Sequence, residues 1–88
     1  MKVTYRASFA RDLRAIQNRS LLNRIRTIIE SVEKAESLAG VPGLKKLQAR
    51  GDYYRIRLGD YRIGLIIEKD TVTFVRVLHR REVYRYFP

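Results

Sequence analysis

The first half of the chain has apolar residues at helical spacing after one short alternating segment. Lys2-Val3-Thr4-Tyr5 alternates as a brief strand does. Ser8 can cap a first helix, which repeats Phe9, Leu13 and Ile16 on one face. Ser20 can cap a second helix, whose apolar stripe of about four turns comprises Leu21, Leu22, Ile25, Ile28, Ile29, Val32 and Ala35. Because only the region around Asn18 to Ser20 separates them, we expect the two helices to form an αα-hairpin.

Beyond Gly40-Val41-Pro42-Gly43, which ends the helical region, the period of the pattern becomes two. The first predicted strand places Tyr54, Ile56 and Leu58 on one face and Tyr53, Arg55 and Arg57 on the other. After a Gly59-Asp60 turn, the next strand divides in the same way into Tyr61, Ile63, Leu65 and Ile67 against Arg62, Gly64, Ile66 and Glu68.

A second turn at Lys69-Asp70 leads into the third predicted strand, Thr71 to Leu78, which is almost continuously apolar and suits a central position. The sequence therefore predicts an α+β fold, in which a short N-terminal strand and a helical hairpin pack on one face of a small antiparallel β-sheet. With 88 residues, we expect a single domain spanning 1–88, which buries roughly 60–65% of its extended surface.

The composition limits which cellular compartment and which classes of binding partner suit this protein. The 19 basic and 9 acidic residues give a formal charge of +10, which favours nucleic acid, an acidic protein or an anionic membrane over a merely soluble surface. The sequence lacks cysteine, a signal-peptide pattern and an apolar run long enough for a membrane span. We expect a cytoplasmic protein with no membrane association, no metal site and no small-molecule cofactor.

Arginines gather on the polar face of the predicted hairpin. If the helices cover the apolar face, Arg55, Arg57 and Arg62 emerge together on the other one. Adjacent strands lie about 4.8 Å apart and alternate residues about 6.6 Å apart, a spacing comparable to that of consecutive RNA phosphates. This pattern predicts an anion-binding surface.

The C-terminal segment adds groups that can take part in proton transfer. His79, the one histidine, is followed by Arg80, Arg81 and Tyr84. Imidazole gains or loses its proton near neutral pH, so His79 is a candidate acid or base, although a histidine at a strand end is more often structural. Tyr84 can equally bury its ring and leave its hydroxyl in water.

Three segments together resemble the RelE/ParE superfamily of type II toxin–antitoxin toxins, on its RelE-like side. They are Leu44-Lys45-Lys46-Leu47, Tyr53-Tyr54-Arg55-Ile56-Arg57-Leu58-Gly59-Asp60-Tyr61-Arg62-Ile63 and Arg76-Val77-Leu78-His79-Arg80-Arg81-Glu82-Val83-Tyr84. The resemblance extends over essentially the whole chain. It implies a metal-independent endoribonuclease that cuts mRNA in the ribosomal A site and is neutralised by a cognate acidic antitoxin.

The resemblance also implies roles for particular residues. Arg55 and Arg57 match the family's basic pair, Arg62 its phosphate-clamping arginine, and Tyr84 its C-terminal tyrosine. The terminal basic position falls on either His79 or Arg80. Contacts with RNA or the ribosome are expected from the other basic residues near the site, namely Lys45, Lys46, Arg50, Arg76, Arg81 and Arg85.

Two arginines depart from the pattern of relatives that have lysine there. A guanidinium is a poor proton acceptor, so Arg55 and Arg57 are better suited to stabilising charge. We therefore expect His79 to handle a proton with help from Tyr84, while the arginines hold the phosphate.

Several alternatives stay open at the level of sequence. The antitoxin could cover the arginines, displace the C-terminal segment or block entry to the ribosome by its bulk. The ParE side of the superfamily shares the fold but inhibits DNA gyrase, and a non-catalytic RNA- or ribosome-binding domain would need the same basic surface.

Overall fold

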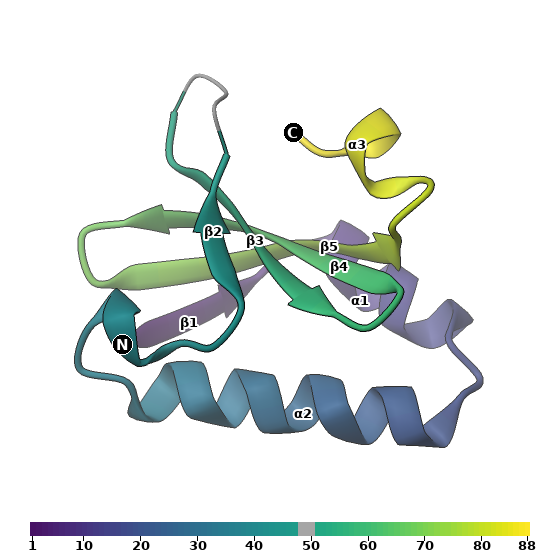
Figure 1. Ribbon diagram of the computed structural model, residues 1–88, viewed down its shortest axis with the longest axis horizontal. Helices are drawn as coiled ribbons and strands as arrows, with labels where there is room; N and C mark the ends of the chain where they lie inside the picture. Colours follow the sequence, from purple (N-terminus) through teal and green to yellow (C-terminus); the bar gives the residue numbers. More distant parts are fainter. Residues whose placement is uncertain (48–50) are drawn as a thin grey trace.

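The computed structural model describes residues 1–47 and 51–88, and it places the N-terminal strand, the helices and the later strands in the predicted order (Figure 1). The elements are β1 (Lys2–Tyr5), α1 (Ala7–Ala15), α2 (Arg19–Lys34), a 3₁₀ turn η1 (Leu38–Gly40), β2 (Leu44–Lys46), β3 (Tyr53–Leu58), β4 (Tyr61–Glu68), β5 (Thr71–His79) and α3 (Val83–Tyr86). This arrangement confirms the predicted α+β class.

The strands form one five-stranded sheet in the order β1-β5-β4-β3-β2. The three predicted strands pair antiparallel, as expected, and β2, which was not predicted, adds antiparallel to β3. By contrast, β1 adds to β5 in parallel with Val3 opposite Val72. The sheet is therefore mixed. A pairing across about 70 residues leaves no local trace in the pattern of either strand, since both directions require the same alternation.

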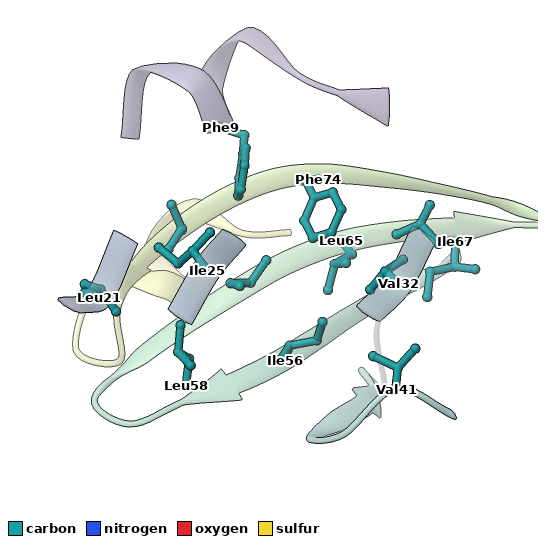
Figure 2. Close-up of a cluster of buried hydrophobic side chains, with 13 residues drawn as sticks. Phe9, Leu21, Ile25, Val32, Val41, Ile56, Leu58, Leu65, Ile67 and Phe74 are labelled. Atoms are coloured by element: carbon teal, nitrogen blue, oxygen red, sulfur yellow. The ribbon is translucent and has the colours of Figure 1, made fainter. Parts of the chain in front are cut away.

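One face of the sheet carries the hydrophobic core. Side chains from β3, β4 and β5 meet Phe9 of α1 and the buried stripe of α2, as Figure 2 shows. The core comprises Phe9, Leu21, Ile25, Val32, Val41, Ile56, Leu58, Ile63, Leu65, Ile67, Val72, Phe74 and Val77. Burying each such aliphatic or aromatic side chain contributes roughly 1.5–3 kcal/mol. The predicted division of both hairpin strands into apolar and polar faces is confirmed.

Both predicted helix caps are wrong in position. Helix α2 begins after Asn18, whose side-chain oxygen accepts a hydrogen bond from Leu21 N–H at 3.0 Å. Ser20 therefore lies inside the first turn. Helix α1 follows Arg6 without a side-chain cap, and the Ser8 hydroxyl donates instead to the carbonyl of Val75 at 2.6 Å. The hydrogen-bond acceptor for Ser8 comes from a strand far away in the sequence, so local rules could not identify it.

The predicted turns at Gly59-Asp60 and Lys69-Asp70 are present. Gly59 and Lys69 have positive φ values of 59° and 56°, the left-handed conformation that tight hairpin turns require. The first turn fixes the register in which Arg57 faces Arg62. Among the described residues, no helix combines the length and apolar character needed to cross a bilayer.

Candidate nucleic-acid interface and catalytic site

The sheet face opposite the helices carries two transverse rows of side chains. Strand register places Lys45, Arg55, Gly64 and Arg76 in one row across β2, β3, β4 and β5. In the neighbouring row Arg57 faces Arg62 directly. We call Arg55, Arg57 and Arg62 the arginine face. The predicted convergence of these three residues is confirmed, because alternation along two paired strands leaves them no other side.

Arg62 is the most constrained member of the arginine face. Its Nη1 donates hydrogen bonds to the carbonyls of Gly59 and Tyr61, at 2.7 Å and 2.8 Å, and the residue is only 8% exposed. Two carbonyls of the β3–β4 turn therefore hold the guanidinium in place. A planar guanidinium has donors on two further nitrogens, Nε and Nη2, which can meet an anion in a fixed orientation.

The electrostatics of this face favour an anion. The pKa of Arg62 is lowered, first by burial and then by the positive charges of Arg57 and Arg55, and Arg80 adds to the effect. The negative charge that Tyr84 carries when it is ionised acts in the opposite direction and raises the Arg62 pKa. A bound phosphate would neutralise this repulsion. Arg80 and Tyr84 are thus close enough to interact electrostatically with Arg62, although both lie outside the hairpin.

The C-terminal segment lies on the same side of the sheet as the arginine face. In Figure 1, α3 and the chain end lie on the opposite side of the sheet from α2. Val83 and Phe87 are buried at 0% and 2% exposure, whereas Tyr84 between them is 57% exposed. The two apolar residues therefore attach the segment to the sheet and leave the phenol hydroxyl accessible.

Arg80 extends the site at the end of β5. Its backbone N–H donates to the carbonyl of Asp60 at 2.7 Å, which ties the strand end to the β3–β4 turn. The side chain lies 3.8 Å from the Asp60 carboxylate, and both groups are largely exposed. Such an ion pair is weak in water, so an incoming phosphate can compete for Arg80.

His79 does not join this cluster, and the expectation that it would share one concavity with the arginines is wrong. Register places it opposite Tyr61, on the helix-covered side of the sheet. The two rings pack edge to face at 5.6 Å, and Nδ1 accepts the backbone N–H of Arg81 at 3.2 Å. Arg80 follows His79 directly, in the turn after β5, and its positive charge acts on Arg62. The geometry therefore favours Arg80 for the terminal basic position.

Arg76 was expected to contact RNA, but it is engaged within the protein. Its Nε and Nη2 donate to the two oxygens of Asp12, at 2.7 Å and 3.1 Å, and the guanidinium lies 5.5 Å from the centre of the Tyr86 ring. Asp12 is itself only 8% exposed. The Arg76 guanidinium is therefore engaged with partners inside the protein, and its expected contact with RNA stays a prediction.

The other residues predicted to contact RNA or the ribosome do not all lie on the same face of the protein. Lys45 faces Arg55 and extends the basic row, whereas Lys46 points to the other face and lies 5.9 Å from the Tyr54 ring centre. Arg81, in the turn before α3, and Arg85, within α3, are exposed. Arg50 lies outside the residues that the structure describes.

Two residues that support the site, Asp12 and Gly64, were not identified from the sequence. Asp12 follows no motif, and its partner Arg76 is 64 positions away. Gly64 carried a usable signal, because an isolated glycine within a strand often marks close approach by another group. Within the described residues, no three His, Cys, Asp or Glu side chains gather as metal ligands would.

Comparison with known proteins identifies relatives over the full length of the chain. Residues 3–84 match the family model described as the ParE toxin of the type II toxin–antitoxin system parDE. The chain is 42% identical, over all of both sequences, to Toxin RelE3 of Methanocaldococcus jannaschii.

Solved structures agree with the sequence relatives. The fold matches a chain of the RelB–RelE antitoxin–toxin complex from Methanococcus jannaschii with a TM-score of 0.82 and 39% identity, covering 97% of this chain and 99% of that one. The fold also matches the toxin–antitoxin complex RelBE2 from Mycobacterium tuberculosis, with a TM-score of 0.72 and 24% identity over 90% and 96% of the two chains. The chain therefore belongs to the RelE/ParE family and is a RelE-family toxin of the type II toxin–antitoxin class.

Proposed function

We propose that this toxin is a metal-independent endoribonuclease that cuts mRNA in the A site of the ribosome. The observation that carries the proposal is the cluster of Arg55, Arg57 and Arg62 on the sheet face opposite the helices, with Arg80 and Tyr84 near enough to act on the charge of Arg62. RNA contains its own nucleophile, the ribose 2′-hydroxyl. An enzyme of this kind needs chiefly to position the backbone and stabilise the charge that develops on the phosphate.

The reaction requires that each bond change and proton have a destination. The 2′-oxygen forms a bond to the adjacent phosphorus while the bond from phosphorus to the 5′-oxygen breaks. The 2′-hydroxyl loses its proton and the 5′-oxygen gains one, which leaves a 2′,3′-cyclic phosphate and a 5′-hydroxyl. The negative charge peaks on the oxygens of the five-coordinate phosphorus, where fixed guanidinium donors stabilise it most.

The arginines are suited to stabilising the negative charge on the phosphate rather than to transferring a proton. Arg62, held by two carbonyls, presents a rigid fork to the phosphate, and Arg57 directly opposite adds a second cation. Because a guanidinium stays protonated, neither can serve as the base. Tyr84, with an exposed hydroxyl close enough to influence Arg62, is the candidate in this cluster for assisting proton transfer.

We also propose that a cognate acidic antitoxin neutralises the toxin. The net charge of +10 favours an acidic partner. Relatives support this pairing, since the Methanococcus jannaschii structure is of a RelB–RelE antitoxin–toxin complex. The antitoxin would act most directly by covering the arginine face.

The ParE-like alternative is inhibition of DNA gyrase. It is favoured by the family model, which is described as the ParE toxin. The same basic surface would then contact a protein or DNA, and no RNA bond would break.

A cleavage assay with translating ribosomes separates these functions. We expect the wild-type toxin to cut mRNA and leave 2′,3′-cyclic phosphate ends, and Arg62→Ala to lose that activity. Arg62→Lys keeps the charge without the fork and should recover activity only in part. Association with ribosomes without cleavage would identify a binding domain, and trapped DNA breaks in a gyrase assay would identify the ParE-like activity. Either result would overturn the ribonuclease proposal.

A further inference from the structure

The C-terminal segment is seated in a notch of the sheet that exists only because residue 64 is glycine. A Cβ atom built on Gly64 would lie 2.6 to 2.8 Å from three atoms of the Phe87 ring, inside any normal contact distance. Both Gly64 and Phe87 are buried. The ring therefore rests directly on the backbone of β4, in a position that any other residue at 64 would close.

The notch lies in the middle of the basic surface. Gly64 is flanked in register by Arg55 on β3 and Arg76 on β5. The Phe87 ring also meets Tyr53 edge-on, with centroids 5.5 Å apart and an angle of 87°. Aromatic pairs with this geometry are favourable beyond the area that they bury. The Phe87 ring is thus held by the backbone at Gly64 and by the ring of Tyr53.

A second contact is made by the residue next to Phe87. Tyr86 lies over Arg76, which Asp12 of α1 holds in place by two hydrogen bonds. Since Asp12 also accepts the backbone N–H of Val77 at 3.0 Å, the support beneath Tyr86 is part of the sheet edge itself. Contacts of two neighbouring residues, Tyr86 and Phe87, therefore hold the C-terminal end of α3 in place.

We propose that Gly64 is a positioning residue: the notch left by its missing side chain seats Phe87 and thereby holds Tyr84 beside Arg62. This inference rests on the proposed function for its catalytic consequence. Val83 attaches the start of α3 to the sheet and Phe87 attaches its end, so a displaced Phe87 ring would tilt Tyr84, which lies between them. Arg55, Arg57 and Arg62 belong to the hairpin and would stay in place.

Gly64→Ala tests the proposal with the smallest possible change. The added methyl group must displace the Phe87 ring, whereas the strand itself accepts alanine, because φ of Gly64 is not among the positive values. We expect kcat for RNA cleavage to fall on the order of 100-fold, the loss that a 1 Å misplacement can cause. KM should change little, since the arginines still bind the phosphate. Unchanged kcat would overturn the proposal.

Gly40→Ala is the matched control. It makes the same chemical change, but its Cβ would meet only the Ala35 methyl, at an ordinary 3.9 Å. We expect wild-type kcat and KM from this variant. A loss equal to that of Gly64→Ala would mean that the effect is not specific to the notch.

Double variants separate positioning from a general loss of structure. Phe87→Ala empties the notch without inserting anything into the sheet, so it provides the same test if Gly64→Ala fails to fold. Gly64→Ala should cost nothing further in a Phe87→Ala or a Tyr84→Phe background. Losses that simply add would contradict the proposal.

Two measurements decide the position of the segment without any cleavage assay. The Phe87 ring should shift the Gly64 Hα resonance in the wild type, and Phe87→Ala should abolish that shift. Trypsin should cut after Arg85 faster in Gly64→Ala than in the wild type or Gly40→Ala. If the wild type cuts no RNA, the proposed function fails, yet these results still support or overturn the seating of Phe87 by Gly64.

Discussion

Asp12 and Arg76 form a bidentate ion pair, with nitrogen–oxygen distances of 2.7 Å and 3.1 Å. The pair lies at the edge of the sheet where β5 extends beyond the end of its neighbour β1. β1 pairs with β5 only as far as Phe74. Beyond that point α1 completes the edge, since Ser8 donates to the carbonyl of Val75 and Asp12 accepts from the N–H of Val77. Two side chains one helical turn apart thus replace the missing strand.

Asp12→Asn should destabilise the protein strongly. It leaves the guanidinium of Arg76 partly buried without its counter-charge, and breaking a buried pair typically costs about 3–5 kcal/mol. The free energy of unfolding from urea denaturation measures the loss.

Asp60→Asn is the control for that variant. The same change here affects an exposed pair with Arg80 at 3.8 Å. We expect no measurable shift in the denaturation midpoint. A shift equal to that of Asp12→Asn would show that burial does not govern the difference.

Asn18→Ala should destabilise α2 by about 0.5–2 kcal/mol, since it removes the acceptor for Leu21 N–H. Ser20→Ala tests the position that the sequence pattern suggested, and it should change stability by less than about 0.5 kcal/mol. Thermal denaturation of both variants checks the assignment. The reverse order of effects would restore Ser20 as the cap.

Arg57→Gln should stabilise the fold while it weakens RNA binding. Like charges directly across two strands destabilise a sheet, and relieving the repulsion between Arg57 and Arg62 should contribute up to about 0.5 kcal/mol after solvent screening. Melting temperature and RNA affinity, measured on the same samples, should therefore move in opposite senses.

Arg26→Gln makes the same change on the opposite side of the molecule. Arg26 lies in a hollow between α1 and α2, beside Glu30 and Glu33. The Arg26→Gln variant should bind RNA nearly as tightly as the wild type does. Equal weakening by both variants would mean that net charge, rather than the arginine face, determines affinity.

Tyr84→Phe should lower kcat for RNA cleavage by about 10²–10⁴-fold, the usual contribution of a proton-transfer group, and leave RNA binding unchanged. Tyr86→Phe is the matched control, because Tyr86 is similarly exposed, at 54% against 57%, and its ring rather than its hydroxyl contacts Arg76. It should cleave at the wild-type rate. Equal losses from both would assign no special role to Tyr84.

His79→Ala should retain RNA cleavage within a few-fold, because the imidazole faces Tyr61 rather than Arg62. Arg80→Ala, at the next position, should lose at least about tenfold, or about 1.4 kcal/mol of transition-state stabilisation. The wild-type rate should show no inflection between about pH 5 and 8, where a catalytic imidazole would change its charge. Such an inflection, if abolished by His79→Ala, would return the proton-transfer role to the histidine.

Local pattern was sufficient for the hairpin and most of the candidate site. Alternation along β3 and β4 predicted that Arg55, Arg57 and Arg62 share a face, since a side chain in a strand has only two directions available. The Gly59-Asp60 turn then set the register. The caps failed for the opposite reason: Ser8 finds its acceptor on β5, and a propensity rule examines only neighbours along the chain.

The sequence by itself determined the α+β class, the basic character and the identity of the polar hairpin face, because each follows from composition or from spacing within a few residues. Only the tertiary structure decided that β1 joins in parallel, that Asp12 engages Arg76, that His79 turns away, and that Phe87 rests on Gly64. These are contacts between residues 23 to 69 positions apart or choices between two sheet faces. Such contacts depend on how the elements pack together, and no single element encodes them.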